Sequence, residues 1–248
     1  MATGLGFGHP LTPGTWLRPL GPSLRRLVIA ILALAILLWA TIPAAISRLT
    51  DPSAIDQVAL TGPRGPQCLR LILAGDVSGS MTQYAAAEQA AVNQFLTWAP
   101  TNLRPDDEIG VLSFAGSIAW NRRPAPANAS TMTTGTPANM SDGTALSPVI
   151  NGIGSLPASG CRTALALLSD GQMQDLPAPQ DARAMQVAAG IDDLSLLVPS
   201  AGIDRPTDWN TTFPAAMGTV FDGTDPNATG LTFAHLVARL TEQTLRKL

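Results

Sequence analysis

Three groups of oxygen-bearing side chains in this 248-residue chain have the types and spacing expected of a metal site. The first is DVSGS, in which Asp76, Ser78 and Ser80 follow a run of apolar residues. The second is SDGTAL, which contains Thr144, and the third is LSDG, which contains Asp170. Two carboxylates and three hydroxyls form an oxygen shell that suits hard cations. The set therefore favours Mg²⁺, with Mn²⁺ or Ca²⁺ as alternatives, over Zn²⁺ or Cu²⁺.

Each motif taken alone also has an ordinary structural explanation. Asp, Ser and Gly are common turn residues, so DVSGS and LSDG also suit turns at the ends of strands. In SDGT, the side chain of Ser141, Asp142 or Thr144 also suits the N-cap of a helix. We favour the metal site because all three motifs occur, and each lies at the end of an expected element.

The elements that would carry these motifs predict an α/β fold. From Cys68 onward, strand-like and helix-like stretches alternate, which is typical of a doubly wound, mostly parallel sheet flanked by helices. The expected strands span 69–74, 108–115, 117–120, 163–169, 194–198 and 219–222, and the expected helices span 81–98, 145–156, 181–189 and 231–248. Two Pro-rich stretches, 122–141 and 201–214, are expected to be loops. Ligands of open α/β sheets bind outside the carboxyl ends of the strands, so we expect the three motifs to converge there.

The order DxSxS, then a GT-containing loop, then SDG after an apolar strand resembles the metal-ion-dependent adhesion site (MIDAS) of von Willebrand factor type A domains. The resemblance covers residues 68–248, including the segments VLSFA and TVFDGTDP. Gly75 and Ser169 depart from the family pattern, which usually has an apolar residue and a threonine there. Neither departure removes a ligand.

The resemblance also implies a role for each motif residue. It implies direct ligation of the cation by Ser78, Ser80 and Thr144. It implies that Asp76 and Asp170 act directly or through water. A coordination position would stay open for a carboxylate of a partner protein.

The two cysteines are placed by the same resemblance. In this family the strands that carry Asp76 and Asp170 are parallel neighbours. Cys68 lies eight residues before the first aspartate, and Cys161 lies nine before the second. Both cysteines would therefore lie at the opposite edge of the sheet, which implies a Cys68–Cys161 disulfide suited to an exported domain. Two unpaired thiols are the alternative, if strand stagger separates the Cα atoms by more than about 7 Å.

A candidate partner surface is found at the start of the first expected loop. Trp120, Arg122 and Arg123 are candidates for recognising an acidic group of the partner near the metal, and solvated loop charges are the alternative. The net charge of −3 leaves no basic surface for nucleic acid.

Residues 27–46 form an apolar run, LVIAILALAILLWATIPAAI, with no charge over 20 residues. At about 1.5 Å per residue, a helix of this length spans the roughly 30 Å hydrocarbon core of a bilayer. We expect a transmembrane signal anchor over 27–46, a cytoplasmic N-terminal arm over 1–26 and a Pro- and Gly-containing linker over 47–67, before the domain at 68–248.

A cleaved signal peptide is the alternative to the anchor. Its apolar region is normally only about 7–15 residues long, and Pro43 disturbs the obvious cleavage sites. Arg18, Arg25 and Arg26 precede the run and only Arg48 closely follows it, so the N-terminus is expected in the cytoplasm. In both cases the domain is exported.

These expectations predict a membrane-tethered module, not an enzyme, that binds a partner protein through a divalent cation in adhesion or in assembly of an envelope complex. Bacterial relatives of this architecture often work with a separate ATPase of the MoxR type, and the ATPase motif GxxxxGK[ST] is absent here. A metal-dependent hydrolase that uses Asp76 and Asp170 is one alternative. Against it, no His, Cys or Lys lies near the motifs, and neither GxSxG nor HExxH occurs. A structural module whose metal only stiffens the loops is the other alternative.

Overall fold

The computed structural model describes residues 51–129, 143–200, 202–203, 207–216 and 218–248, and the statements below concern these residues. The chain divides into two compact units, Met1–Asp51 and Pro52–Leu248, and the second carries the described elements. The helix expected over 27–46 and the arm expected over 1–26 lie outside the described residues, as do Ser141 and Asp142. In the described ranges, no helix is both long enough and apolar enough to cross a membrane.

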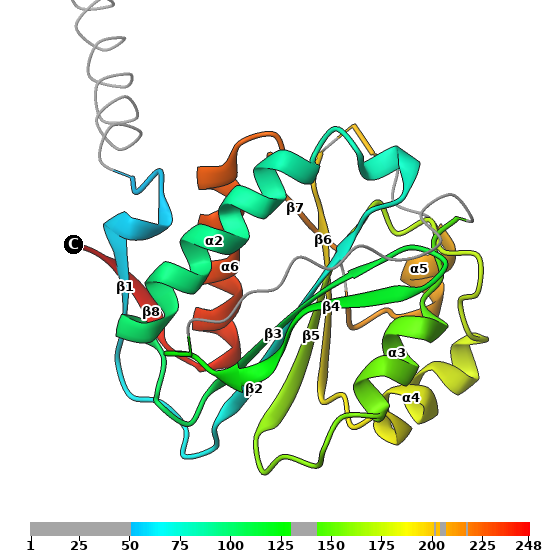
Figure 1. The fold of residues 1–248 in the computed structure, drawn as a ribbon, viewed down its shortest axis with the longest axis horizontal. Coiled ribbons are helices and arrows are strands. Elements are labelled where there is room, and N and C mark those ends of the chain that lie inside the picture. Colours follow the sequence, from blue (N-terminus) through cyan, green and yellow to red (C-terminus); the bar gives the residue numbers. More distant parts are fainter. Residues whose placement is uncertain (1–50, 130–142, 201, 204–206, 217) are drawn as a thin grey trace, which may run out of the picture. The chain divides into compact units, whose positions relative to one another are not determined.

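A six-stranded sheet forms the centre of the second unit, in the order β4-β3-β2-β5-β6-β7 (Figure 1). Its strands are β2 (Leu69–Asp76), β3 (Glu108–Phe114), β4 (Ile118–Pro126), β5 (Arg162–Leu168), β6 (Asp193–Val198) and β7 (Thr219–Val220). Among these strands only β4 runs antiparallel to its neighbour. All eight residues of β2 are buried, as expected for a continuous apolar strand in the middle of a mostly parallel sheet.

Helices cover both faces of this sheet, and the alternation of side chains along β2 separates two apolar cores. Leu71 and Leu73 belong to the core beneath α2 (Ala85–Asn102) and α6 (Pro226–Leu240). Ile72 and Ala74 belong to the core on the opposite face. The helices on that face are α3 (Ser147–Gly154), α4 (Pro179–Ala188) and α5 (Thr207–Thr212) (Figure 1). The predicted α/β fold with a mostly parallel sheet flanked by helices is therefore confirmed.

The two stretches expected to be loops are partly regular structure. The strand expected to end at Trp120 continues as β4 to Pro126, because an edge strand tolerates prolines whose nitrogen has no ladder partner. The stretch 201–214 contains α5, where Trp209 is fully buried and its Nε1 donates to the carbonyl of Ala216 at 3.0 Å. The prediction of loops was wrong for these segments.

The segment expected to be a linker also contributes to the domain. Residues Ile55–Gln57 form a short 3-10 helix, η1, and β1 (Val58–Thr61) pairs antiparallel with β8 (Thr244–Lys247). The last helix was expected to reach residue 248, but α6 ends at Leu240, because Glu242 adopts a left-handed conformation with φ of 59°. The final residues therefore leave the helix and form β8.

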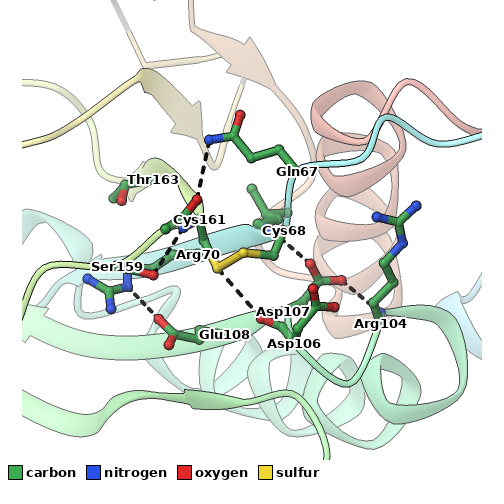
Figure 2. The surroundings of a disulfide bond; sticks show 12 residues. Gln67, Cys68, Arg70, Arg104, Asp106, Asp107, Glu108, Ser159, Cys161 and Thr163 are labelled. Atoms are coloured by element: carbon green, nitrogen blue, oxygen red, sulfur yellow. Dashed lines mark hydrogen bonds and ion pairs between the residues drawn. A yellow bond between two sulfur atoms is a disulfide. The ribbon is translucent and has the colours of Figure 1, made fainter.

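The disulfide expected between Cys68 and Cys161 is confirmed (Figure 2). The next residues, Leu69 and Arg162, are paired in the register of β2 and β5, so the two cysteines lie at equal depth. Their Cα atoms are 4.5 Å apart, well inside the limit for a bridge. The disulfide therefore joins the amino-terminal ends of the two central strands.

Candidate metal centre

The first motif forms a tight turn directly after β2. Asp76 ends the strand, and its Oδ1 accepts the backbone N–H of Ser78 at 2.9 Å. Gly79–Met81 then form the 3-10 helix η2. This turn brings Ser78 Oγ within 3.3 Å of Ser80 Oγ. Two hydroxyls from positions two residues apart are thus placed side by side at the carboxyl edge of the sheet.

The third motif is joined to the first through Ser169. Its Oγ donates to Asp76 Oδ2 at 2.7 Å and accepts the N–H of Gly171 at 3.0 Å. Asp76 is only 2% exposed, and both of its carboxylate oxygens already accept hydrogen bonds. Its position therefore suits contact with a cation through water. This contact joins residues 93 positions apart in the sequence, so no local pattern indicates it.

The second and third motifs meet the first in a shallow depression of about 320 Å³. Thr144 and Asp170 are both nearly buried, and Asp170 Oδ1 accepts the N–H of Gln172 at 2.9 Å. The depression is lined by Ser78, Gly79, Ser80, Gly143, Thr144, Asp170, Gln172 and Gln174. The structure thus brings four of the five predicted ligands to one place, and it places Asp76 beside them.

The donor set of this depression fits a hard cation. It offers hydroxyl, carboxylate and amide oxygens, and neither a thiol nor an imidazole lines it. Across the described residues, no group of three or more His, Cys, Asp and Glu side chains is placed to hold a metal. The predicted set has only two carboxylates, so most of its donors would be hydroxyls.

The structure does not place the predicted partner surface at this depression. Trp120 and Arg122 lie along β4, paired with Leu112 and Val111 of β3. Arg122 is only 5% exposed and donates to the carbonyl of Pro126 at 2.7 Å, and burial lowers the pKa of its guanidinium. Arg123 is exposed and lies over the Trp120 ring at 5.9 Å. β4 is longer than the sequence indicated, so Trp120, Arg122 and Arg123 belong to a strand and not to the start of a loop. Their role in recognising a partner stays a prediction.

An acidic residue missed in the sequence lies next to the site. Glu88 of α2 packs against Gly75, where a Cβ atom would lie 1.9 Å from Glu88 Oε1. Any side chain at position 75 would displace this carboxyl. Burial, and secondarily the charge of Asp76, raises the pKa of Glu88 to about 8. A glycine within an apolar strand was the available signal, because it marks a close approach.

This raised pKa makes the stability of the metal-free protein pH-dependent. The folded protein keeps the proton on Glu88 up to about pH 8, whereas the unfolded chain loses it near pH 4.5. The folded state binds more protons in this window, so the free energy of unfolding falls as pH rises from 4.5 to 8 and then levels off. We expect a fall of about 1 kcal/mol per pH unit, discounted for the partial exposure of Glu88.

Glu88→Gln should remove most of this fall, because the amide keeps the shape and has no proton to lose. Urea unfolding in EDTA at pH 5.5, 6.5, 7.5 and 8.5 measures the free energy of unfolding of both proteins. The variant should be more stable than the wild type, and this difference should be largest at pH 8.5. Burial also raises the pKa of Asp76, so a smaller slope at lower pH should persist in the variant. Parallel curves for the two proteins across the whole range would contradict the assignment to Glu88.

Comparison with known proteins gives matches by fold. No protein-family model matches the sequence, and no curated protein matches it. Proximal thread matrix protein 1 from the mussel byssus, solved with a zinc occupied MIDAS motif, is 13% identical, with 71% of this chain and 48% of that chain covered and a TM-score of 0.48. The pilus adhesin SpaC from Lactobacillus rhamnosus GG is 11% identical, with 73% and 31% covered and a TM-score of 0.51. A von Willebrand factor type A structure from Catenulispora acidiphila is 17% identical, with 69% and 42% covered and a TM-score of 0.46.

These matches bear on the fold alone, because every identity is below one fifth. The chain spans about half the length of the mussel protein and less of the other two.

Proposed function

Because this chain has the fold of von Willebrand factor type A domains, we propose that it is a protein-binding module that acts through a divalent cation. The observation that carries the proposal is the depression at the carboxyl edge of the sheet, where three distant motifs meet. Ser78, Ser80 and Thr144 would bind the cation through their hydroxyls. Asp76 and Asp170 would bind it directly or through water.

The charge of this site favours an acidic partner. The two carboxylates of Asp76 and Asp170 would balance the charge of a bound divalent cation. The cation would supply an electrophilic centre with one open coordination position. The neutral side chains of Gln172 and Gln174 line the same depression, so no further fixed charge of the lining repels an incoming carboxylate. A carboxylate of the partner protein is the ligand that suits this position. Mg²⁺ is the proposed cation, with Mn²⁺ or Ca²⁺ as alternatives.

Binding rather than catalysis is the proposed activity. No His, Cys or Lys lines the depression, and its one carboxylate, Asp170, is a proposed ligand of the cation, so it would not be free to act as a general base. The proposed setting is outside the cytoplasm, with residues 27–46 as the membrane anchor and the N-terminus inside. The Cys68–Cys161 bridge supports this setting, because disulfides persist in oxidising compartments. Adhesion or assembly of an envelope complex, with a separate ATPase of the MoxR type, are the proposed roles.

Affinity capture from envelope extract tests this function. The tagged chain is used in Mg²⁺, in EDTA, and as Asp76→Ala in Mg²⁺. Asp181→Ala, which removes an exposed carboxylate of α4, is the matched control. We expect a partner to be retained by the wild type and by the control in Mg²⁺, and to be lost in EDTA and with Asp76→Ala. A partner retained equally in all four samples would contradict binding through a metal.

A further inference from the structure

Helix α3, which follows the Thr144 loop, has no capping side chain of its own. Its N-cap position is Leu146, and Leu146 has no side-chain oxygen to accept a hydrogen bond. The first N–H groups of a helix need acceptors outside the helix. Here the two carboxylate oxygens of Asp175 are the acceptors. Its Oδ1 accepts the N–H of Leu146 at 2.6 Å, and its Oδ2 accepts the N–H of Ser147 at 2.8 Å.

Asp175 belongs to the loop after β5, five residues beyond Asp170, and this loop makes another bond to the same segment. The N–H of Gln174 donates to the carbonyl of Thr144 at 2.9 Å. The side chain of Gln174 also packs over Gly143, where a Cβ atom would lie 2.1 Å from Gln174 Nε2. Three hydrogen bonds and one close contact therefore hold the loop with Thr144 against the loop with Asp170.

This arrangement leaves the hydroxyl of Thr144 available. Within the described residues, the Thr144 side chain makes no hydrogen bond, although the residue is only 5% exposed. Thr144 was one of the residues whose side chain suited the N-cap. The carboxylate of Asp175 takes that role instead, and Thr144 lines the depression.

We propose that Asp175 is a positioning residue of the metal centre, which holds Thr144 in place for the cation by clamping the start of α3 to the loop after β5. The inference rests on the proposed function, because it concerns the same site. Asp175 does not line the depression, so it acts only through the loop that it holds. The loss of such an outer partner typically lowers metal affinity about 10- to 100-fold.

Titration with Mn²⁺, followed by the electron paramagnetic resonance signal of the free ion, tests the inference on the full chain in detergent. Asp175→Ala should weaken Mn²⁺ binding roughly 10- to 100-fold. Asp175→Asn keeps one acceptor oxygen, so its affinity for Mn²⁺ should lie between the affinities of Asp175→Ala and the wild type. It replaces Asp175→Ala in this test if the alanine variant does not fold. The matched control is Asp192→Ala, which loses the bond from the N–H of Thr163 at 2.8 Å at the amino-terminal end of β5. The control should bind Mn²⁺ like the wild type.

A double-mutant cycle separates positioning from general stability. In the Thr144→Ala background, Asp175→Ala should weaken Mn²⁺ binding less than about threefold, because the group that it positions is gone. Equal losses in both backgrounds, or unchanged affinity of both Asp175 variants while the wild type binds Mn²⁺, would overturn the positioning role alone. A wild-type protein that binds no Mn²⁺ would overturn the proposed function and this inference with it.

Discussion

Replacing both Cys68 and Cys161 by serine is expected to lower the free energy of unfolding by about 4–5 kcal/mol. The bridge closes a loop across a sequence separation of 93 residues, so its loss frees a large part of the unfolded chain. For a domain of this size, the change corresponds to a melting temperature lower by roughly 10–18 °C. Thermal unfolding and urea unfolding of the two proteins under non-reducing conditions measure it.

The double serine variant also supplies its own control. A reductant should destabilise the wild type to the level of the variant and should leave the variant unchanged. The serines lie in half-buried positions, where their hydroxyls can be solvated, so buried polar groups add little to the loss. A difference of less than about 1 kcal/mol between the oxidised wild type and the variant would refute a stabilising role for this disulfide.

The sheet and the convergence of the motifs followed from the sequence, because local patterns determine both. The apolar run of β2 indicated a buried strand, and strand–helix alternation indicated a mostly parallel sheet. In such a sheet the carboxyl ends of the strands share one edge. Asp76, Thr144 and Asp170 were therefore expected together, and the structure places them around one depression or beside it.

The elements that the sequence did not predict depend on distant partners. Strand β1 has only four residues and a Pro-rich neighbourhood, and it forms because β8 pairs with it across the domain. In the sequence, Leu245 has the spacing expected of the apolar face of α6. The apolar periodicity alone therefore favoured a longer helix, although Leu245 belongs to β8. The indole N–H of Trp98 donates to the carbonyl of Val58 at 2.8 Å, which ties β1 to α2. No local pattern indicates these contacts.

The surroundings of the site were missed for a similar reason. Asp175 follows the DGQMQ segment as an ordinary loop residue, and only the fold places it at the start of α3. Glu88 lies in a helix, and no local pattern indicates its packing against Gly75. The sequence thus indicated the candidate ligands but not the side chains that hold them, because those side chains act across tertiary contacts.

Arg64 and Asp107 form the ion pair that secures the segment before β2, and Asp107→Ala should cost about 3–5 kcal/mol of stability. Two guanidinium nitrogens of Arg64 lie 2.5 Å from the two oxygens of Asp107. The same carboxylate accepts the backbone N–H groups of Leu69 and Arg104, at 2.8 and 2.7 Å. Asp107 is fully buried and the Arg64 side chain is 7% exposed, so removing the carboxylate leaves a buried charge and two buried donors without partners.

Three variants at this ion pair should differ in a definite order. Arg64→Met should cost least, because Asp107 keeps its two backbone donors. Asp107→Asn should be intermediate, since one carbonyl oxygen remains as an acceptor, and Asp107→Ala should cost most. Urea unfolding measures the three free energies. Limited proteolysis should also show faster cleavage at Gly62–Gln67 in the Asp107 variants. Asp107 holds the backbone of Arg104, and the Arg104 guanidinium donates to the carbonyls of Arg64 and Pro66 in that segment. Equal losses from Arg64→Met and Asp107→Ala would show that the charge pair alone, and not the backbone contacts, accounts for the stability.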